Sequence, residues 1–340
     1  MACRTPGANQ VTANSYKSAL TDRLVSKVPR IVSLIASATE IVYALGMGDF
    51  IVARSHECDF PSSVQSLPVC TSPKFGISGN SQEIDRLVKE RLQTAFSVYE
   101  VDEELLEQLQ PTLIVTQSQC DVCAVSLRDV EAALRRRLTC RPKIVSLQPN
   151  ALTDIWNDIR SVAAALDVVK TGEQLVETLN HRLNAISVRA LASPRRPTVA
   201  CLEWIEPLMA GGNWVPELVE MAGATNLFGV AGKHSPWLDW NSLCGRDPDC
   251  LVVMPCGFDL DRTEKEMYWL AERPEWKSLR AVKNGQVYLT DGNQYFNRPG
   301  PRVVESLQIL AEILHPELFP PELERKGWKK FEARNSTTEA

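Results

Sequence analysis

The sequence predicts two doubly wound α/β lobes with mostly parallel sheets, linked by a single long helix. First, short runs rich in β-branched residues alternate with amphipathic segments over residues 30–150 and again over 193–318. Second, residues 151–192 carry apolar side chains at helical spacing, with Gly172 as their one strong breaker. Third, 340 residues are enough for two domains of ordinary size.

The first strand–helix–strand unit covers residues 30–61 and establishes the N-terminal lobe. Its strands are expected at 31–35 and 51–53, where β-branched and apolar residues run together as in a buried parallel strand. Ser37 or Thr39 is expected to cap the helix between them. A polar turn follows the second strand at its carboxyl end. Open α/β sheets bind ligands at that end, so this unit also carries a candidate site.

The same patterns assign the remaining elements of both lobes. In the N-terminal lobe, helices are predicted at 81–90, 102–109 and 126–138, and strands at 112–116 and 143–147. In the C-terminal lobe, strands are predicted at 198–202, 250–254 and 286–289, and helices at 215–222 and 302–314.

Between the lobes, the apolar spacing fits one long helix or two abutting helices. A helix of about 40 residues would span about 60 Å, which suits a spacer rather than an ordinary domain helix. The chain is therefore divided into a polar, disordered tail (1–29), the N-terminal lobe (30–150), the connecting helix (151–192), the C-terminal lobe (193–318) and a charged, peripheral tail (319–340).

Composition and charge exclude several classes of function. The net charge is −5 and no cluster of Lys and Arg dominates a segment, so we expect no nucleic-acid partner. No segment approaches the roughly 18 apolar residues that a membrane-spanning helix needs. The sequence contains no G-x-S-x-G, HExxH or P-loop motif, so we expect that the protein is not an enzyme. We also expect the chain to be a monomer.

The cysteines and the N-terminus predict a cytoplasmic protein. Residues 1–29 are polar throughout and contain no apolar core of a secretory signal peptide. The 10 cysteines are spread along the chain instead of forming the dense framework of a small disulfide-bonded domain. Free thiols in a reducing compartment are therefore expected.

Four ordered segments resemble a known family. They are RIVSLIASATEIVYALGMGDFIVARSHECDFP (30–61), GGNWVPELVEMAG (211–223), the stretch 274–288, and DGNQYFNRPGP (291–301). Together they resemble the cobalamin- and iron-chelate-binding proteins of ABC importers, most closely the vitamin B12-binding type. The resemblance implies a class III periplasmic-binding-protein-like fold, a small-molecule metal chelate such as cobalamin as the ligand between the lobes, and an ABC permease as partner.

A Cys- and His-rich edge is the candidate metal site. His56, Glu57 and Cys58 follow one predicted strand, and Gln117 ends another, shortly before a CxxC motif formed by Cys120 and Cys123. If the two loops share one sheet edge, a zinc or iron site could form from His56, Cys58, Cys120 and Cys123. The CxxC pair could equally be a redox pair or purely structural.

Aromatic and polar residues near predicted loops are the candidate ligand contacts. Flat aromatic side chains suit a large planar chelate, although a tryptophan can also simply pack a lobe core. Arg298 could pair with a carboxylate or phosphate of the ligand. The candidate ligand-binding set is His56, Glu57, Phe75, Gln117, Glu203, Trp204, Trp214, His234, Trp237, Tyr295, Phe296 and Arg298.

Two functional hypotheses follow. The first is a binding protein that holds a corrinoid or another metal chelate between two lobes, with affinity from buried aromatic surface and a few polar groups. The second is an intracellular metal-binding protein or metalloenzyme that reuses the fold and binds zinc or iron at the Cys/His site.

Overall fold

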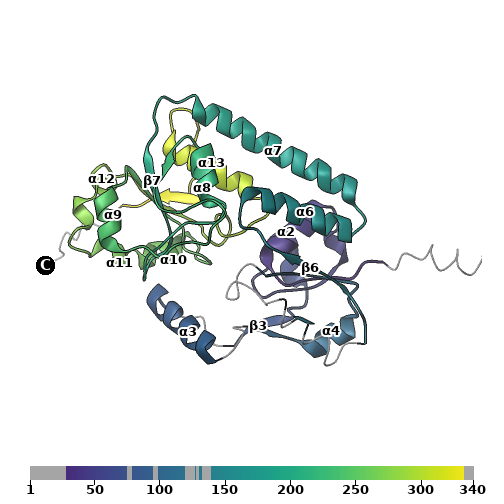
Figure 1. The fold of residues 1–340 in the computed structure, drawn as a ribbon. Helices are drawn as coiled ribbons and strands as arrows, with labels where there is room; N and C mark the ends of the chain where they lie inside the picture. The colour runs from purple at the N-terminus through teal and green to yellow at the C-terminus, as the bar shows by residue number, and fades with distance from the viewer. Residues whose placement is uncertain are drawn as a thin grey trace, which may run out of the picture.

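The computed structural model describes residues 28–74, 79–94, 99–118, 127, 130–131 and 139–332. Two α/β lobes lie side by side, and a pair of helices crosses from one to the other along one side of the molecule (Figure 1). The two-lobed α/β fold predicted from the sequence is thus confirmed. The predicted helix at 126–138 falls mostly outside the described residues.

The N-terminal lobe is built on a four-stranded parallel sheet in the order β2-β1-β5-β6. β1 lies between β2 and β5, and all three of its residues are buried. Its short, mainly apolar sequence is typical of a strand that is covered on both faces of the sheet. The described elements of this lobe are β1 (Ile31–Ser33), α2 (Ala36–Ala44), β2 (Ile51–Arg54), β3 (Thr71–Pro73), α3 (Ser81–Thr94), β4 (Tyr99–Val101), α4 (Glu103–Leu109), β5 (Leu113–Gln117) and β6 (Lys143–Leu147).

The C-terminal lobe has a second sheet in the order β12-β11-β10-β7-β8, with β9 beside β7. Its three central strands are parallel, and β8 and β12 are antiparallel. The elements are β7 (Thr198–Trp204), β8 (Met209–Ala210), α8 (Val215–Met221), β9 (Thr225–Asn226), α9 (Trp240–Arg246), β10 (Cys250–Val253), α10 (Leu260–Glu266), α11 (Tyr268–Ala271), α12 (Arg280–Lys283), β11 (Val287–Thr290), α13 (Val303–Leu314) and β12 (Trp328–Lys330).

The sequence-based division places residues 319–340 in a peripheral tail, and the structure differs there. β12 pairs with β11, and Trp328 packs edge-on against Tyr288 with ring centroids 5.7 Å apart. The Trp328 indole also donates a 2.7 Å hydrogen bond to Glu312 of α13. Because of these contacts, the segment up to Phe331 is part of the lobe. Its strand was not predicted, because the segment is rich in charged residues.

The connection between the lobes is a pair of helices, α6 (Leu152–Ala165) and α7 (Val169–Leu191). The chain turns back at Asp167, which adopts a left-handed conformation with φ 58°. A single straight spacer of 151–192 is therefore wrong, and the alternative of two helices holds. Gly172 does not interrupt the helix, because it lies inside α7. A Cβ atom at this position would come within 2.5 Å of the Ala163 Cβ on α6.

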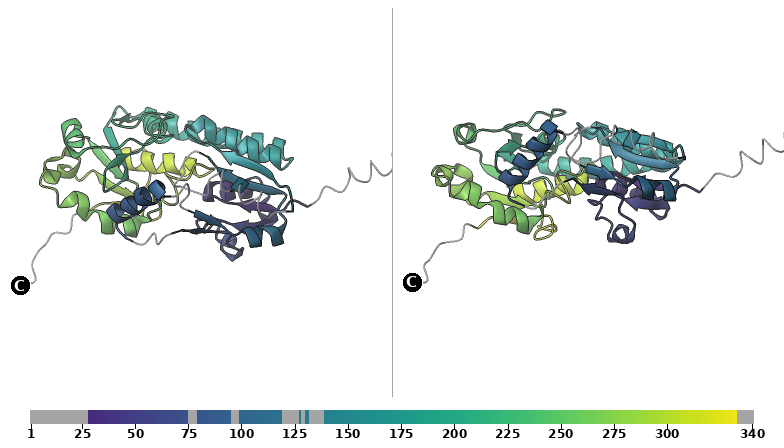
Figure 2. Two further views of the ribbon diagram at one scale, coloured as in Figure 1. Left: turned by 60° about the horizontal axis from the view of Figure 1, so that its bottom comes forward. Right: turned by 90° about the horizontal axis from the view of Figure 1, so that it is seen from below.

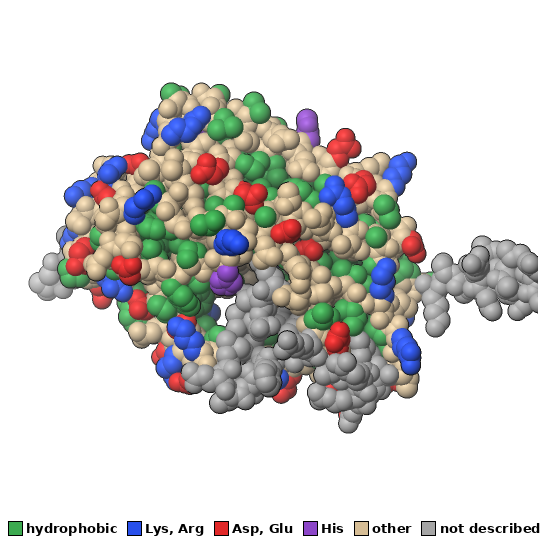
Figure 3. All heavy atoms as spheres, viewed as in Figure 1, with side chains coloured by type: hydrophobic (Ala, Val, Ile, Leu, Met, Phe, Trp, Pro, Cys, Tyr) green, Lys and Arg blue, Asp and Glu red, His purple; other side chains and the backbone are tan. Residues whose placement is uncertain are grey.

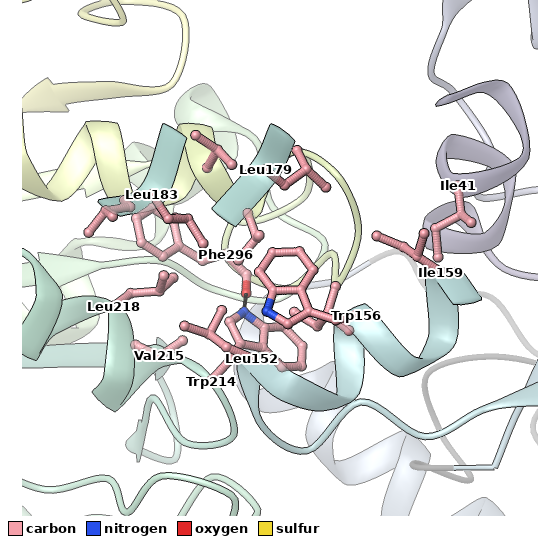
Figure 4. Close-up of a cluster of buried hydrophobic side chains, with 14 of the residues drawn as sticks. Ile41, Leu152, Trp156, Ile159, Leu179, Leu183, Trp214, Val215, Leu218 and Phe296 are labelled. Carbon is pink, nitrogen blue, oxygen red and sulfur yellow. Dashed lines mark hydrogen bonds between the residues drawn. The ribbon is translucent and has the colours of Figure 1, made fainter. Parts of the chain in front are cut away.

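One hydrophobic core runs from the N-terminal lobe through α6 and α7 into the C-terminal lobe. Figure 4 shows Ile41 of α2 next to Ile159 of α6, and Leu179 and Leu183 of α7 next to Phe296. Because both lobes pack on the same two helices, large rotations of one lobe against the other would expose this core.

Within the described ranges, no helix is long and apolar enough to cross a membrane. On the face drawn in Figure 3, basic and acidic side chains are interspersed over both lobes.

Candidate functional site

The loop after β2 holds His56 at the carboxyl edge of the N-terminal sheet. The backbone N–H of His56 donates to the Thr71 hydroxyl at 3.0 Å, and its ring Nδ1 lies 2.8 Å from the same oxygen. If the Thr71 hydroxyl donates to Ser55, 3.1 Å away, it accepts from Nδ1–H, and that tautomer leaves the lone pair of the imidazole on Nε2. His56 Nε2 is buried and has no hydrogen-bond partner in the described part of the chain.

Glu57 lies beside His56 and is weakly acidic. The Tyr99 hydroxyl donates to the Glu57 carboxylate at 3.4 Å, and the Tyr99 ring also lies against the His56 ring with centroids 5.3 Å apart. Burial raises the pKa of Glu57 to about 7, against the opposing charge of Arg298. Burial, together with the charge of Arg54, lowers the pKa of His56. At neutral pH, this loop therefore presents an uncharged imidazole and a carboxyl that is partly protonated.

Cys58 does not share this edge with His56. Its side chain is 1% exposed, and its sulfur accepts a hydrogen bond from the Thr39 hydroxyl at 3.0 Å. Burial raises the pKa of the Cys58 thiol to about 11, so the thiol is neutral in the metal-free protein. Cys58 is thus packed in the lobe interior and stays a predicted metal ligand only.

The remaining members of the predicted metal site are outside the described residues. Cys120 and Cys123 fall there, as does the candidate ligand contact Phe75. Gln117 is described, and it lies buried at the end of β5, where it is 3% exposed. Among the residues described, no group of three or more His, Cys, Asp or Glu side chains is placed to hold a metal ion.

In the C-terminal lobe, Glu203 lies near the carboxyl end of β7. The Ser235 hydroxyl donates to its carboxylate at 2.8 Å and accepts from the Gly212 N–H at 3.1 Å. Burial raises the pKa of Glu203, while the hydrogen bond from Ser235 and the charge of His234 act against that shift. His234 is exposed beside this cluster, and its ring Nδ1 lies 3.0 Å from the Ser235 carbonyl.

Trp204 and Trp237 lie at the edge of the C-terminal lobe. The Trp204 ring packs against Phe258 with centroids 5.2 Å apart, and its indole N–H is shared between the carbonyls of Ser81 and Glu206. Trp237 is 58% exposed, so one large aromatic surface is open to solvent at this edge.

Two of the predicted ligand contacts belong to the core instead. Trp214 is 5% exposed and Phe296 is completely buried. The Trp214 indole donates to the Phe296 carbonyl at 3.1 Å, and both rings pack among the side chains of α6, α7 and α8 (Figure 4). Their prediction as ligand contacts is therefore wrong, because these aromatic side chains close the seam between the C-terminal lobe and the helix pair.

Arg298 is occupied by an ion-pair network between the lobes. Its guanidinium contacts Asp59 at 2.5 Å and Glu40 at 3.2 Å, both in the N-terminal lobe, and Arg302 contacts Glu40 at 2.5 Å. Although burial opposes it, Arg298 lowers the pKa of Asp59 through a hydrogen bond and its charge. Arg298 therefore joins the lobes and is not free for an anionic group of a ligand.

Tyr295 lies at the rim of that network. The Arg302 guanidinium lies 5.4 Å from the Tyr295 ring centre and 4.0 Å from the Phe60 ring centre. Sequence reasoning missed Glu40 and Arg302. Arg302 follows the segment that resembles a ligand-facing loop, but Glu40 lies in a buried helix, and nothing near it in the sequence signals a distant partner.

Two surface cavities lie away from these residues. One of about 570 Å³ is lined by the start of α10, Asp291 and the chain around β12. The other, of about 520 Å³, runs along α7 with Arg160 of α6. Apart from Leu260 in the first and Val176 in the second, charged and polar side chains line both cavities, and neither is lined by a predicted ligand contact.

The arrangement of two α/β lobes on a shared helix pair can be compared with known proteins. Residues 31–294 match the family model described as "Periplasmic binding protein". The chain belongs to the periplasmic binding protein family. It is 23% identical over 307 residues to the uncharacterized ABC transporter substrate-binding lipoprotein YvrC of Bacillus subtilis (strain 168), over 88% of this chain and 84% of that protein.

Two further relatives support this membership. The vitamin B12-binding protein of Vibrio vulnificus (strain CMCP6) is 23% identical over 286 residues, which cover 84% of this chain and 89% of that protein. The crystal structure of the periplasmic vitamin B12-binding protein BtuF of Vibrio cholerae matches with a TM-score of 0.60 at 20% identity, over 84% of this chain and 96% of that chain. The predicted resemblance is therefore confirmed.

The same relatives correct the expected location. The Bacillus relative is named a lipoprotein and the Vibrio cholerae protein periplasmic, which contradicts a cytoplasmic protein. The prediction relied on spread cysteines and a polar N-terminus. Buried thiols such as Cys201 and Cys250 need no reducing compartment to remain unpaired, because the core protects them from oxidants.

Proposed function

We propose that this member of the periplasmic binding protein family binds a metal chelate of the corrinoid type between its two lobes and presents it to an ABC permease. The observation that carries the proposal is the buried ring nitrogen Nε2 of His56, which has no hydrogen-bond partner among the described residues. A neutral imidazole nitrogen is a good ligand for cobalt or iron, and a lone pair without a donor is costly to bury unless a ligand uses it.

The protonation of the surrounding side chains supports a ligand with neutral polar groups. Burial raises the pKa of Glu57 to about 7, so its carboxyl can donate a hydrogen bond at or below neutral pH, and burial also raises the pKa of Glu203. Arg298 and Arg302, which would suit carboxylates, are already paired with Glu40 and Asp59. The amide-rich rim of a corrinoid fits this environment better than the two propionates of haem.

Spectral titration of the purified protein tests the proposal. We expect micromolar or tighter binding of aquocobalamin, with a change in its absorbance as His56 Nε2 replaces the axial water. His56→Ala should abolish that absorbance change. It should leave the binding of cyanocobalamin nearly unaltered, because cyanide already occupies the axial position.

His181→Ala is the matched control, since it removes an exposed histidine of α7 that is not a candidate ligand contact. It should keep the absorbance change with aquocobalamin. Failure of both cobalamins and of hemin to bind at micromolar concentration would overturn the proposal. Binding of hemin alone would retain a chelate-binding protein but reject the corrinoid class.

A further inference from the structure

Helix α3 belongs to the N-terminal lobe by sequence but docks on the C-terminal lobe. It lies in the chain between β3 and β4, which pair with each other in the N-terminal lobe. In space, it lies against the C-terminal lobe below α10, and both views of Figure 2 agree with Figure 1 on this placement.

Three side chains of the C-terminal lobe hold the beginning of α3. Glu266 of α10, which is 6% exposed, accepts from both the backbone N–H and the hydroxyl of Ser81, at 3.1 and 2.9 Å. Trp204 donates its indole N–H to the Ser81 carbonyl at 3.2 Å. Arg262 donates to the Gly79 carbonyl at 2.7 Å.

The docked end of α3 is a well-formed helix start. Asn80 and Glu83 form a reciprocal cap, in which each side chain accepts from the other residue's backbone N–H, at 2.9 and 3.0 Å. The Glu266 carboxylate adds a buried negative charge at the positive end of the helix dipole. Farther along α3, the Lys89 ammonium lies 4.7 Å from the ring centre of Trp237. The helix is thus anchored at two places.

The position of this contact gives it a consequence for binding. Trp204 is the last residue of β7, and the carboxyl ends of parallel strands are where open α/β sheets bind ligands. A helix supplied by one lobe therefore lies at the carboxyl end of β7 in the other lobe, the edge at which a ligand is expected. The Arg298 network already joins the lobes elsewhere, so α3 is a second, separate bridge between them.

We propose that α3 is a strap that closes over the C-terminal lobe, and that its release from Glu266 limits ligand entry. The kinetic part rests on the proposed function, whereas the docking itself is testable without any ligand. Glu266 acts here as a positioning residue, because it accepts hydrogen bonds from Ser81 and is not proposed to contact the ligand.

Hydrogen exchange of the ligand-free protein tests the docking. Glu266→Gln removes the charge that receives both Ser81 donors, and we expect exchange of the α3 amides to quicken about tenfold. Glu264→Gln is the matched control on the same helix, since Glu264 pairs with Lys329 and not with α3. If the α3 amides exchange equally slowly in these two variants, the proposal that Glu266 holds α3 as a strap is overturned. Ser81→Ala, which removes one donor from α3 itself, should quicken exchange in the same direction even if Glu266→Gln folds poorly.

Stopped-flow binding tests the role in entry. With the cobalamin that binds in the titrations above, Glu266→Gln should raise the association rate constant several-fold over Glu264→Gln. If Glu266→Gln speeds hydrogen exchange of the α3 amides but leaves the association rate constant unchanged, α3 does not control ligand entry. If no cobalamin or hemin binds at all, the proposed function fails, while the exchange result still decides whether α3 is docked through Glu266.

Discussion

Asp158 is a buried carboxyl group whose ionisation opposes folding. It lies on α6 and is 7% exposed; one oxygen accepts from the Gln148 N–H at 3.3 Å, and the other has no partner among the described residues. Burial, with a smaller contribution from the charge of Asp154, raises its pKa to about 7. Its ordinary pKa is about 4, so the folded state holds this proton more tightly than the unfolded chain.

The sign of the pH effect follows from that difference. The stability that the protonated carboxyl contributes is complete below about pH 4 and is lost as the pH rises through about 7. Asp158→Asn should therefore stabilise the protein at pH 8 by about 1–2 kcal/mol and have little effect at pH 5. Urea denaturation at both pH values measures this. Glu177→Gln, at an exposed position of α7, is the control, and an equal effect of both substitutions would contradict the prediction.

At the scale of elements, close packing of α6 on α7 depends on Gly172. A Cβ atom there would lie 2.5 Å from the Ala163 Cβ, much closer than two carbons approach. Gly172→Ala should therefore destabilise the protein by about 1–3 kcal/mol, although alanine is the better helix former. Adding Ala163→Gly should recover most of that loss, because it empties the space that the new methyl group needs. Denaturation of the two single variants and the double variant measures the coupling; strict additivity would rule this packing out.

Most strands and helices were predictable from the sequence because their apolar periodicity is local. The strands at 31–35 and 143–147 and the helix at 302–314 follow from such patterns, as does the polar loop after β2. The turn at Asp167 was not predictable, since a left-handed aspartate has no strong sequence signal and Gly172 offered a better apparent breaker.

The candidate site was predictable only where one segment supplies it. His56 and Glu57 follow a recognisable strand, so their position at the sheet edge could be predicted. Trp214 and Phe296 could not be separated from ligand contacts, because an aromatic residue near a glycine-rich loop looks the same in either role. Arg298 and its partner Glu40 are 258 residues apart, and only the fold brings them together.

At the scale of the whole molecule, the lobes are coupled by a shared core and by a buried ion-pair network. The Arg298 side chain is 5% exposed and that of Glu40 is 2% exposed, so both buried charges depend on the ion pairs of this network, which also includes Asp59 and Arg302. Removing one member of a buried pair leaves an uncompensated charge, which costs about 3–5 kcal/mol. Replacing partners on both sides by apolar residues can cost much less.

Arg298→Leu should therefore lower the free energy of unfolding by about 3 kcal/mol, because Asp59 loses its ion-pair partner and Glu40 keeps only Arg302. Arg182→Leu is the matched control, since its ion pair with Glu305 is half-exposed and should contribute less than about 1 kcal/mol. Calorimetry should record one cooperative transition for the wild-type protein, because the core crosses both lobes. In Arg298→Leu, α6 and α7 still join the lobes, so the transition should move to lower temperature without splitting. Two separate transitions would mean that the network, and not the shared core, couples the lobes.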